Sequence, residues 1–305
     1  MQTCDTRPLR TPRPLAPGDT VRLVSPASPP EREAVEQAAD ILRSWGLVVT
    51  LGDHVFDRYG FLAGTDDNRL ADLNAALRDP TVRAIVATRG GKGSYRIADS
   101  LDFAAAVRDP KWLVGFSDIT ILQLALFRHG GIASVHGALY PGGEGRPAEE
   151  TTASLRHALF SGEPQVVLSR PEEPTARLTT GGVAEGPLVG GNLEMIATAA
   201  GWALPDLAGA ILLIEQPQAH PGQIDRPLTM LRKAGHLDGL AGVAVGQLEG
   251  PAPRQTDTIL AILADHLSEM DVPVLGGPPI GHGRAPVAVR TGRRASIDGT
   301  KGTSA

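Results

Sequence analysis

The chain has 305 residues, of which 42% are hydrophobic and 21% are charged, and its formal net charge at pH 7 is −5. This length and composition allow one large or two medium globular domains with their own cores, and the small negative charge does not favour nucleic acid or an anionic membrane as a partner. The 36 glycines and 25 prolines favour a loop-rich α/β protein over a helical bundle.

The start of the chain carries the single cysteine, Cys4, so an intramolecular disulfide is excluded. Residues 1–16 are polar and contain prolines, and we expect them to form a flexible tail. They hold no apolar signal-peptide core, and no run of 18 apolar residues predicts a membrane span. We therefore expect a cytoplasmic protein without a membrane anchor.

Short apolar runs and amphipathic segments alternate along residues 17–145, which we interpret as one domain. Because strands that alternate with helices usually form a parallel sheet with helices on both faces, this pattern predicts an α/β domain. The expected strands are 21–28, 47–51, 82–88 and 111–116, and the expected helices are 31–46, 66–79 and 119–130.

The composition changes after this domain. Residues 141–182 are polar and rich in proline and glycine, which predicts a linker or mobile segment over 146–182. A second α/β domain is expected over 183–305. Its expected strands are 210–215 and 240–247, and its expected helices are 224–235, which we start near Pro227, and 256–270. The sequence "GPLVGGNLEM" (186–195) is interpreted as a glycine turn that enters a helix.

The stretch "LVGFSDIT" (113–120) places Ser117 between an apolar strand and a helix. Ligands of α/β proteins gather at the carboxyl ends of strands, and a helix N-terminus favours a developing oxyanion. The nucleophile pattern G-x-S-x-G is half met, because Gly115 is present but Ile119 replaces the second glycine. Ser117 is thus either a nucleophile or a residue that caps the helix.

A serine nucleophile needs a base and an acid that orients the base. His282 lies in the Gly/Pro-rich loop "GGPPIGHGRAP" after an apolar strand, and His136 and His220 are competing loop histidines. Glu215 ends the apolar strand "AILLIE". A carboxylate there needs a partner, which is either the histidine or an arginine such as Arg226.

The stretch "TRGGKGSYR" (88–96) is a glycine-rich turn after a strand. It fits neither phosphate-binding motif, and its backbone N–H groups would serve as half of an oxyanion hole. The chain has no H-E-x-x-H motif and no Cys/His cluster, so we expect no metal site.

Together, several of these stretches resemble the LD-carboxypeptidase family, the serine peptidases also called muramoyltetrapeptide carboxypeptidases. The resemblance extends from about Pro17 to about Gly292. Its carriers are "VSPAS", "LAGTDDNRLADLNAALRDPTVRAIVATRGGKGSYR", "PKWLVGFSDITILQLAL", "VHGALYPGG", "GPLVGGNLEMI", "AILLIEQPQAHPGQIDRPLTML" and "PPIGHG".

The resemblance implies a residue for each role. Ser117 matches the nucleophile, Glu215 the acid and His282 the general base, while the backbone N–H groups of Gly91 and Asp118 match the oxyanion hole. The implied fold is an N-terminal flavodoxin-like parallel-sheet domain with a smaller C-terminal α/β domain. The implied protein is a homodimer without cofactor or metal.

The implied activity is hydrolysis of the amide bond between an L-centre and a terminal D-amino acid in muropeptide tetrapeptides. Arg89, Lys92 and Arg284 are candidates for binding the substrate carboxylate. The chain departs from the family pattern at Lys92, where a tyrosine is common, in "QPQAHPGQID" and in "AAGWALP", all expected near the site.

Two other functions stay open. One is hydrolysis of a peptide–nucleotide or similar natural product by the immunity branch of the same family, which carries an aromatic residue in a longer insert. Residues 141–182 contain no Trp or Tyr, which favours the carboxypeptidase. The other is a non-catalytic binding module on the same fold.

Overall fold

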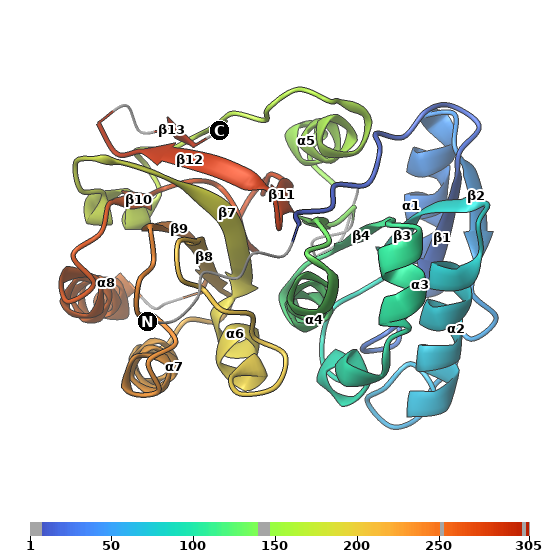
Figure 1. The fold of residues 1–305 in the computed structure, drawn as a ribbon, viewed down its shortest axis with the longest axis horizontal. Coiled ribbons are helices and arrows are strands. Elements are labelled where there is room, and N and C mark those ends of the chain that lie inside the picture. The colour runs from blue at the N-terminus through green and yellow to red at the C-terminus, as the bar shows by residue number, and fades with distance from the viewer. Residues whose placement is uncertain (1–7, 140–146, 251–252, 301–302, 305) are drawn as a thin grey trace.

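The computed structural model describes residues 8–139, 147–250, 253–300 and 303–304. Within these residues the chain forms two α/β domains that lie side by side (Figure 1). Cys4 and the rest of segment 1–7 lie outside the described residues, as do residues 140–146 of the expected linker. In the described part of the chain, no helix is both long and apolar enough to cross a membrane.

The N-terminal domain contains a six-stranded sheet in the order β11-β5-β4-β3-β1-β2. Strands β1 to β5 are parallel, and only β11 runs antiparallel, beside β5. The strands are β1 (Thr20–Val24), β2 (Val48–Leu51), β3 (Val82–Ala87), β4 (Trp112–Gly115), β5 (Ser134–His136) and β11 (Val289–Thr291).

Helices cover both faces of this sheet, as the alternating sequence pattern predicted. Helices α1 (Arg32–Ser44) and α5 (Glu149–Phe160) pack on one face, and α2 (Asp66–Arg78), α3 (Phe103–Arg108) and α4 (Thr120–Gly130) pack on the other. In α2, the hydroxyl of Thr65 accepts a hydrogen bond from the N–H of Asn68 and caps the helix as expected.

The C-terminal domain contains a seven-stranded mixed sheet in the order β10-β9-β8-β7-β12-β13-β6. Strands β7 to β10 are parallel, and β12, β13 and β6 extend the sheet with antiparallel pairs. The strands are β6 (Val167–Leu168), β7 (Val183–Asn192), β8 (Ile211–Gln216), β9 (Gly242–Leu248), β10 (Val274–Gly276), β12 (Arg294–Asp298) and β13 (Thr303–Ser304).

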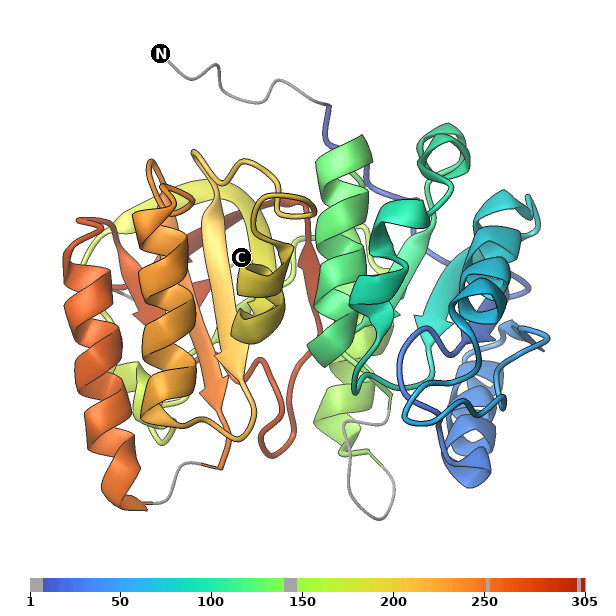
Figure 2. The same ribbon diagram turned by 90° about the horizontal axis from the view of Figure 1, so that it is seen from below.

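A row of helices joins the two domains. Helices α6 (Leu193–Ala199), α7 (Pro221–Lys233) and α8 (Pro253–Ser268) cover one face of the second sheet, and α6 lies beside α4 of the first domain (Figure 2). One continuous cluster of buried apolar side chains fills the space under these helices in both domains. The two sheets are therefore held together by a shared core.

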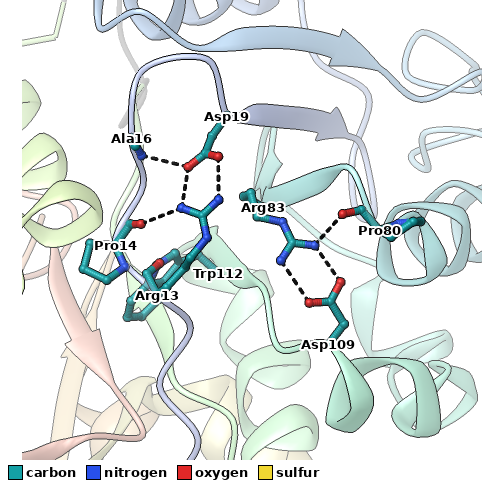
Figure 3. Close-up of polar contacts among 8 residues, drawn as sticks. All are labelled: Arg13, Pro14, Ala16, Asp19, Pro80, Arg83, Asp109 and Trp112. Atoms are coloured by element: carbon teal, nitrogen blue, oxygen red, sulfur yellow. Dashed lines mark hydrogen bonds and ion pairs between the residues drawn. The ribbon is translucent and has the colours of Figure 1, made fainter.

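Residues 8–16 were expected to belong to a flexible tail, but they pack against the N-terminal domain. Arg13 forms an ion pair with Asp19, and its carbonyl oxygen accepts a hydrogen bond from the indole N–H of Trp112 at 2.9 Å (Figure 3). Leu15 is buried. The composition of this segment could not reveal these contacts, because each partner lies elsewhere in the chain.

Three other segments also differ from the expectations. The expected linker contains helix α5 and strand β6, which join the first and second domain respectively. Helix α7 begins at Pro221 and continues through Pro227, because its buried face packs on the core. Residues 183–192 form a strand and not a turn, although Gly190 and Gly191 have positive φ angles of 127° and 142°.

Candidate active site

Ser117 lies at the carboxyl end of β4, where the chain makes a sharp bend. Phe116 is fully extended, with φ −149° and ψ −175°, and Ser117 adopts the left-handed conformation with φ 59°. A short 3-10 turn, Ser117–Ile119, then leads into α4. A non-glycine residue with positive φ costs about 1 kcal/mol or more, so the bend is a strained position that the surrounding contacts maintain.

The bend requires a glycine before the serine. A side-chain Cβ on Gly115 would come within 2.5 Å of the Ile119 side chain, which folds back onto the strand end. Ile119 therefore occupies the space next to Gly115. The N-cap residues of the 3-10 turn and of α4 are Phe116 and Ile119, so Ser117 caps neither element. The capping interpretation of Ser117 is wrong.

Glu215 is completely buried near the end of β8. Ile211 and Leu213 belong to the core on the face away from the helices, whereas Leu212 and Ile214 pack under the helices. Because side chains of a strand alternate between faces, Glu215 points to the same side as Ile211 and Leu213. Its buried carboxylate thus lies on the face of the sheet opposite to helices α6, α7 and α8.

His282 binds this carboxylate. Its Nδ1 lies 2.6 Å from Oε2 of Glu215, and its side chain is 12% exposed. With the carboxylate accepting a hydrogen bond from Nδ1–H, Nε2 is the basic nitrogen of the neutral ring. The close approach depends on Gly281, where a Cβ would lie 3.2 Å from Oε2 of Glu215 and where φ is 142°. The partner of Glu215 is this histidine and not Arg226.

The histidine loop also meets the serine bend. The imidazole of His282 packs on the ring of Phe116, with 4.5 Å between the ring centroids and 32° between the planes. Phe116 directly precedes Ser117 and comes from the first domain, whereas His282 comes from the second. The structure thus brings the acid, the base and the residue before the serine together where the two domains meet.

The glycine-rich loop after β3 lies against the same bend. A Cβ on Gly90 would be 3.0 Å from Cβ of Ser117, and a Cβ on Gly91 would be 2.4 Å from Oγ of Ser28. Gly91 has φ 105°, a backbone conformation that residues other than glycine rarely adopt. The Ser28 hydroxyl accepts a hydrogen bond from the backbone N–H of Lys92 at 3.1 Å. Ser28 therefore holds the glycine-rich turn in place.

Arg69 ties this loop to its surroundings, a role that the sequence did not predict. Its fully buried guanidinium donates hydrogen bonds to the carbonyl oxygens of Pro26 and Gly93, the latter at 2.9 Å. It thereby connects the loop after β1 with the loop after β3. The sequence shows Arg69 only as one polar residue of the amphipathic helix α2, and nothing in it indicates that this side chain is buried.

Asp118 and Ser94 complete the connection to the serine bend. The backbone N–H of Ser94 donates to Oδ2 of Asp118 at 2.8 Å, and the Ser94 hydroxyl donates to the Asp118 carbonyl oxygen at 2.6 Å. Burial raises the pKa of the Asp118 carboxyl above its usual value, and hydrogen bonding to Ser94 opposes that rise. The Asp118 side chain is therefore a structural brace of the serine bend.

The sequence suggested that His136 lies in a loop, but the residue belongs to β5. Its side chain is 1% exposed, and its Nε2 is 3.9 Å from Oε1 of Glu215. Burial lowers the pKa of His136 to about 4, although the Glu215 charge acts in the opposite direction. His136 is consequently neutral at pH 7. His220, the other competing histidine, precedes α7 and is exposed.

The three candidate cations lie on the surface. Arg89 donates a hydrogen bond to the carbonyl oxygen of Pro29 at 3.2 Å, and Lys92 and Arg284 are exposed. Within the described residues, neither Lys92 nor Arg284 forms an ion pair. Nor do the described residues contain a group of three or more His, Cys, Asp or Glu side chains that could hold a metal ion.

The chain matches family models over most of its length. The model of the LD-carboxypeptidase N-terminal domain matches residues 21–137, and that of the LD-carboxypeptidase C-terminal domain matches residues 185–297. The first match includes the serine bend and the glycine-rich loop, and the second includes Glu215 and His282. Both halves of the site therefore lie inside the matched regions.

Several carboxypeptidases are similar to this chain over nearly their full length. A probable murein peptide carboxypeptidase of Bacillus subtilis is 34% identical over 297 residues, covering 96% of this chain and 93% of its own. A murein tetrapeptide carboxypeptidase of Pseudomonas aeruginosa is 31% identical, with coverages of 92% and 94%. The crystal structure of a muramoyltetrapeptide carboxypeptidase from Oxalobacter formigenes superposes with a TM-score of 0.82 at 27% identity, covering 93% of this chain and 97% of that one.

Proposed function

Since the chain belongs to the LD-carboxypeptidase family of serine peptidases, we propose that it removes the terminal D-amino acid from muropeptide tetrapeptides. The scissile amide joins that residue to an L-configured centre of a diamino acid. The observation that carries the proposal is the buried pair of Glu215 and His282, which packs directly against the strained serine bend.

The proposed reaction starts at Ser117. Nε2 of His282 takes the hydroxyl proton while Oγ attacks the carbonyl carbon, and Glu215 stabilises the imidazolium that forms. Backbone N–H groups of Gly91 and Asp118 donate to the oxyanion of the tetrahedral intermediate. The imidazolium then protonates the departing amine of the D-residue. Water, deprotonated by the same histidine, hydrolyses the acyl-enzyme and restores Ser117.

A panel of peptides tests the substrate. We expect purified protein to release D-alanine from a tetrapeptide with an L-to-D terminal bond and to leave D-to-D, D-to-L and L-to-L terminal bonds intact, as measured by mass spectrometry of the products. The Ser117→Ala variant is the control for contaminating peptidases. Cleavage of an aminoacyl-nucleotide amide in place of the tetrapeptide would support the immunity-type function. Failure of the protein to react with a fluorophosphonate probe would support a non-catalytic binding module.

We propose that Lys92 binds a substrate carboxylate. Its backbone is fixed by Ser28 next to the glycine loop, and its exposed ammonium has no ion-pair partner within the described residues. A charge-assisted contact contributes about 1.5 to 3 kcal/mol, or roughly ten- to a hundredfold in kcat/KM. We expect Lys92→Met and Lys92→Tyr to lose this factor on a free tetrapeptide and to change little on its C-terminal amide.

The matched control for Lys92 is Lys233→Met, which removes an exposed lysine at the end of α7 and should leave both substrates unaffected. Equal losses on the acid and the amide would exclude Lys92 from carboxylate binding. Arg89→Met and Arg284→Met, measured on the same two substrates, then show whether either remaining candidate takes that role.

The cysteine content and the family resemblance bear on the compartment and the assembly. A chain with one cysteine suits a reducing compartment, and the resemblance to the family implies a homodimer, so we propose a cytoplasmic dimer. Light scattering of the purified protein should give twice the mass of one chain. A concentration-independent monomer would contradict this assembly.

A further inference from the structure

Two unsatisfied polar groups face each other behind the Glu215–His282 pair. Oε1 of Glu215 is buried and accepts no hydrogen bond from the described residues, and neither ring nitrogen of His136 has a partner there. The two groups are neighbours, with 3.9 Å between Nε2 of His136 and Oε1 of Glu215. Burial of a polar atom without a partner is costly, so a buried pair of this kind calls for an explanation.

The surroundings decide which nitrogen of His136 faces the carboxylate. His136 pairs with Gly115 in β4 and with Val289 in β11, so its backbone is fixed on both sides. A Cβ on Gly191 would lie 2.8 Å from Nδ1 of His136. The Thr120 hydroxyl, whose Oγ1 would lie 2.8 Å from the same Cβ, already accepts a hydrogen bond from the N–H of Asn192, and Nδ1 makes no hydrogen bond to it or to any other described residue. The tautomer with the proton on Nε2 directs its only N–H toward Glu215.

Charge favours the same arrangement. The charged and titratable groups that act on His136 are Glu215, which would stabilise an imidazolium, and His282, which opposes it. Burial outweighs the carboxylate and keeps His136 neutral at pH 7. A neutral imidazole can donate one hydrogen bond to a carboxylate without adding a second positive charge next to His282.

We propose that His136 is a positioning residue, which donates its Nε2 proton to Oε1 of Glu215 and thereby sets how strongly Glu215 attracts the proton of His282. The inference rests on the proposed function, because it assumes that His282 activates Ser117. The distance of 3.9 Å exceeds a hydrogen bond, and catalytic contacts of this kind often shorten only in the reacting complex.

A fluorophosphonate probe tests this proposal without knowledge of the peptide substrate. In the labelling reaction the Oγ–P bond of Ser117 forms, fluoride leaves, and the hydroxyl proton passes to His282. The labelling rate is measured from pH 5 to 9 in the wild type, His136→Gln and His136→Phe. Glutamine can place an amide N–H near the position of Nε2, whereas phenylalanine fills the space and donates nothing.

On the acid limb of the pH profile we expect His136→Phe to label about tenfold more slowly than the wild type, the effect of one hydrogen bond to a charged group. The acid limb of its pH profile should also move to higher pH, because Glu215 without a donor holds the proton of His282 more strongly. His136→Gln should stay within about threefold of the wild type. Ser134→Ala, which alters a buried side chain of the same strand, is the matched control and should label normally.

Equal losses in His136→Phe and His136→Gln without a change in the pH profile would mean that His136 only packs, and wild-type behaviour of His136→Phe would overturn the proposal outright. Thermal unfolding verifies that each variant is folded. If His136→Phe does not fold, His136→Met, which is apolar and flexible, replaces it. Failure of the proposed function is distinct, because the wild type then labels without cleaving tetrapeptides or does not label at all.

Discussion

Replacing Ser117 by alanine should abolish peptide hydrolysis and leave the fold intact. Loss of the nucleophile of a serine hydrolase typically lowers kcat by about 10⁶, because the remaining groups have no atom to attack the carbonyl. Alanine keeps the Cβ that the bend already accommodates, so we expect a melting temperature close to that of the wild type. Steady-state kinetics with the tetrapeptide and thermal unfolding measure the two effects.

The strained φ angle of Ser117 offers an independent control. Ser117→Gly should be as inactive as Ser117→Ala, but it should be more stable, by about 1 kcal/mol, because glycine adopts φ 59° without steric cost. An alanine variant that retains more than a tenth of wild-type activity would exclude Ser117 as the nucleophile. A glycine variant less stable than the alanine variant would contradict the description of the bend as strained.

The second large effect is expected at His282. His282→Ala should lower kcat nearly as far as Ser117→Ala, because it removes the proposed acceptor of the hydroxyl proton. Glu215→Gln should cost less, roughly 10⁴-fold. A glutamine of the same shape can accept the Nδ1 hydrogen bond through its carbonyl oxygen, so the ring stays oriented, but it cannot stabilise the imidazolium.

His220→Ala is the matched control for the base, because His220 is exposed at the start of α7 and should be replaceable without effect. Kinetics of the three variants are compared with their unfolding curves. An inactive His220→Ala variant beside an active His282→Ala variant would move the base to the other histidine.

Strands β1 to β4 and helices α1, α2 and α4 of the first domain could be predicted from local patterns, whereas α3, β5 and β11 are too short to give such a pattern. Helix α2, for example, is capped by Thr65 and ends just before Pro80. The serine bend could be suspected from Gly115 and Ser117, because the need for a glycine there arises from residues only four positions apart. Local sequence therefore carried the information for this half of the site.

The rest depends on contacts between distant residues. Gly190 and Gly191 suggested a turn, yet they lie in a strand whose neighbours approach too closely for side chains, since a Cβ on Gly190 would lie 2.2 Å from the Leu213 carbonyl oxygen. The contact between His136 and Glu215 is equally invisible to local patterns. So is the buried position of Arg69, whose partners lie in two other loops. Only the assembled sheets show what these residues touch.

Strand β11 has a consequence for how the enzyme is made. It comes from residues 289–291, yet it forms the edge of the first sheet beside β5, which carries His136. When a ribosome has released only the first half of the chain, the first sheet still lacks its edge strand, and the proposed base His282 has not been made. Closure of this sheet therefore awaits the last part of translation, and under the proposed mechanism so does peptide hydrolysis.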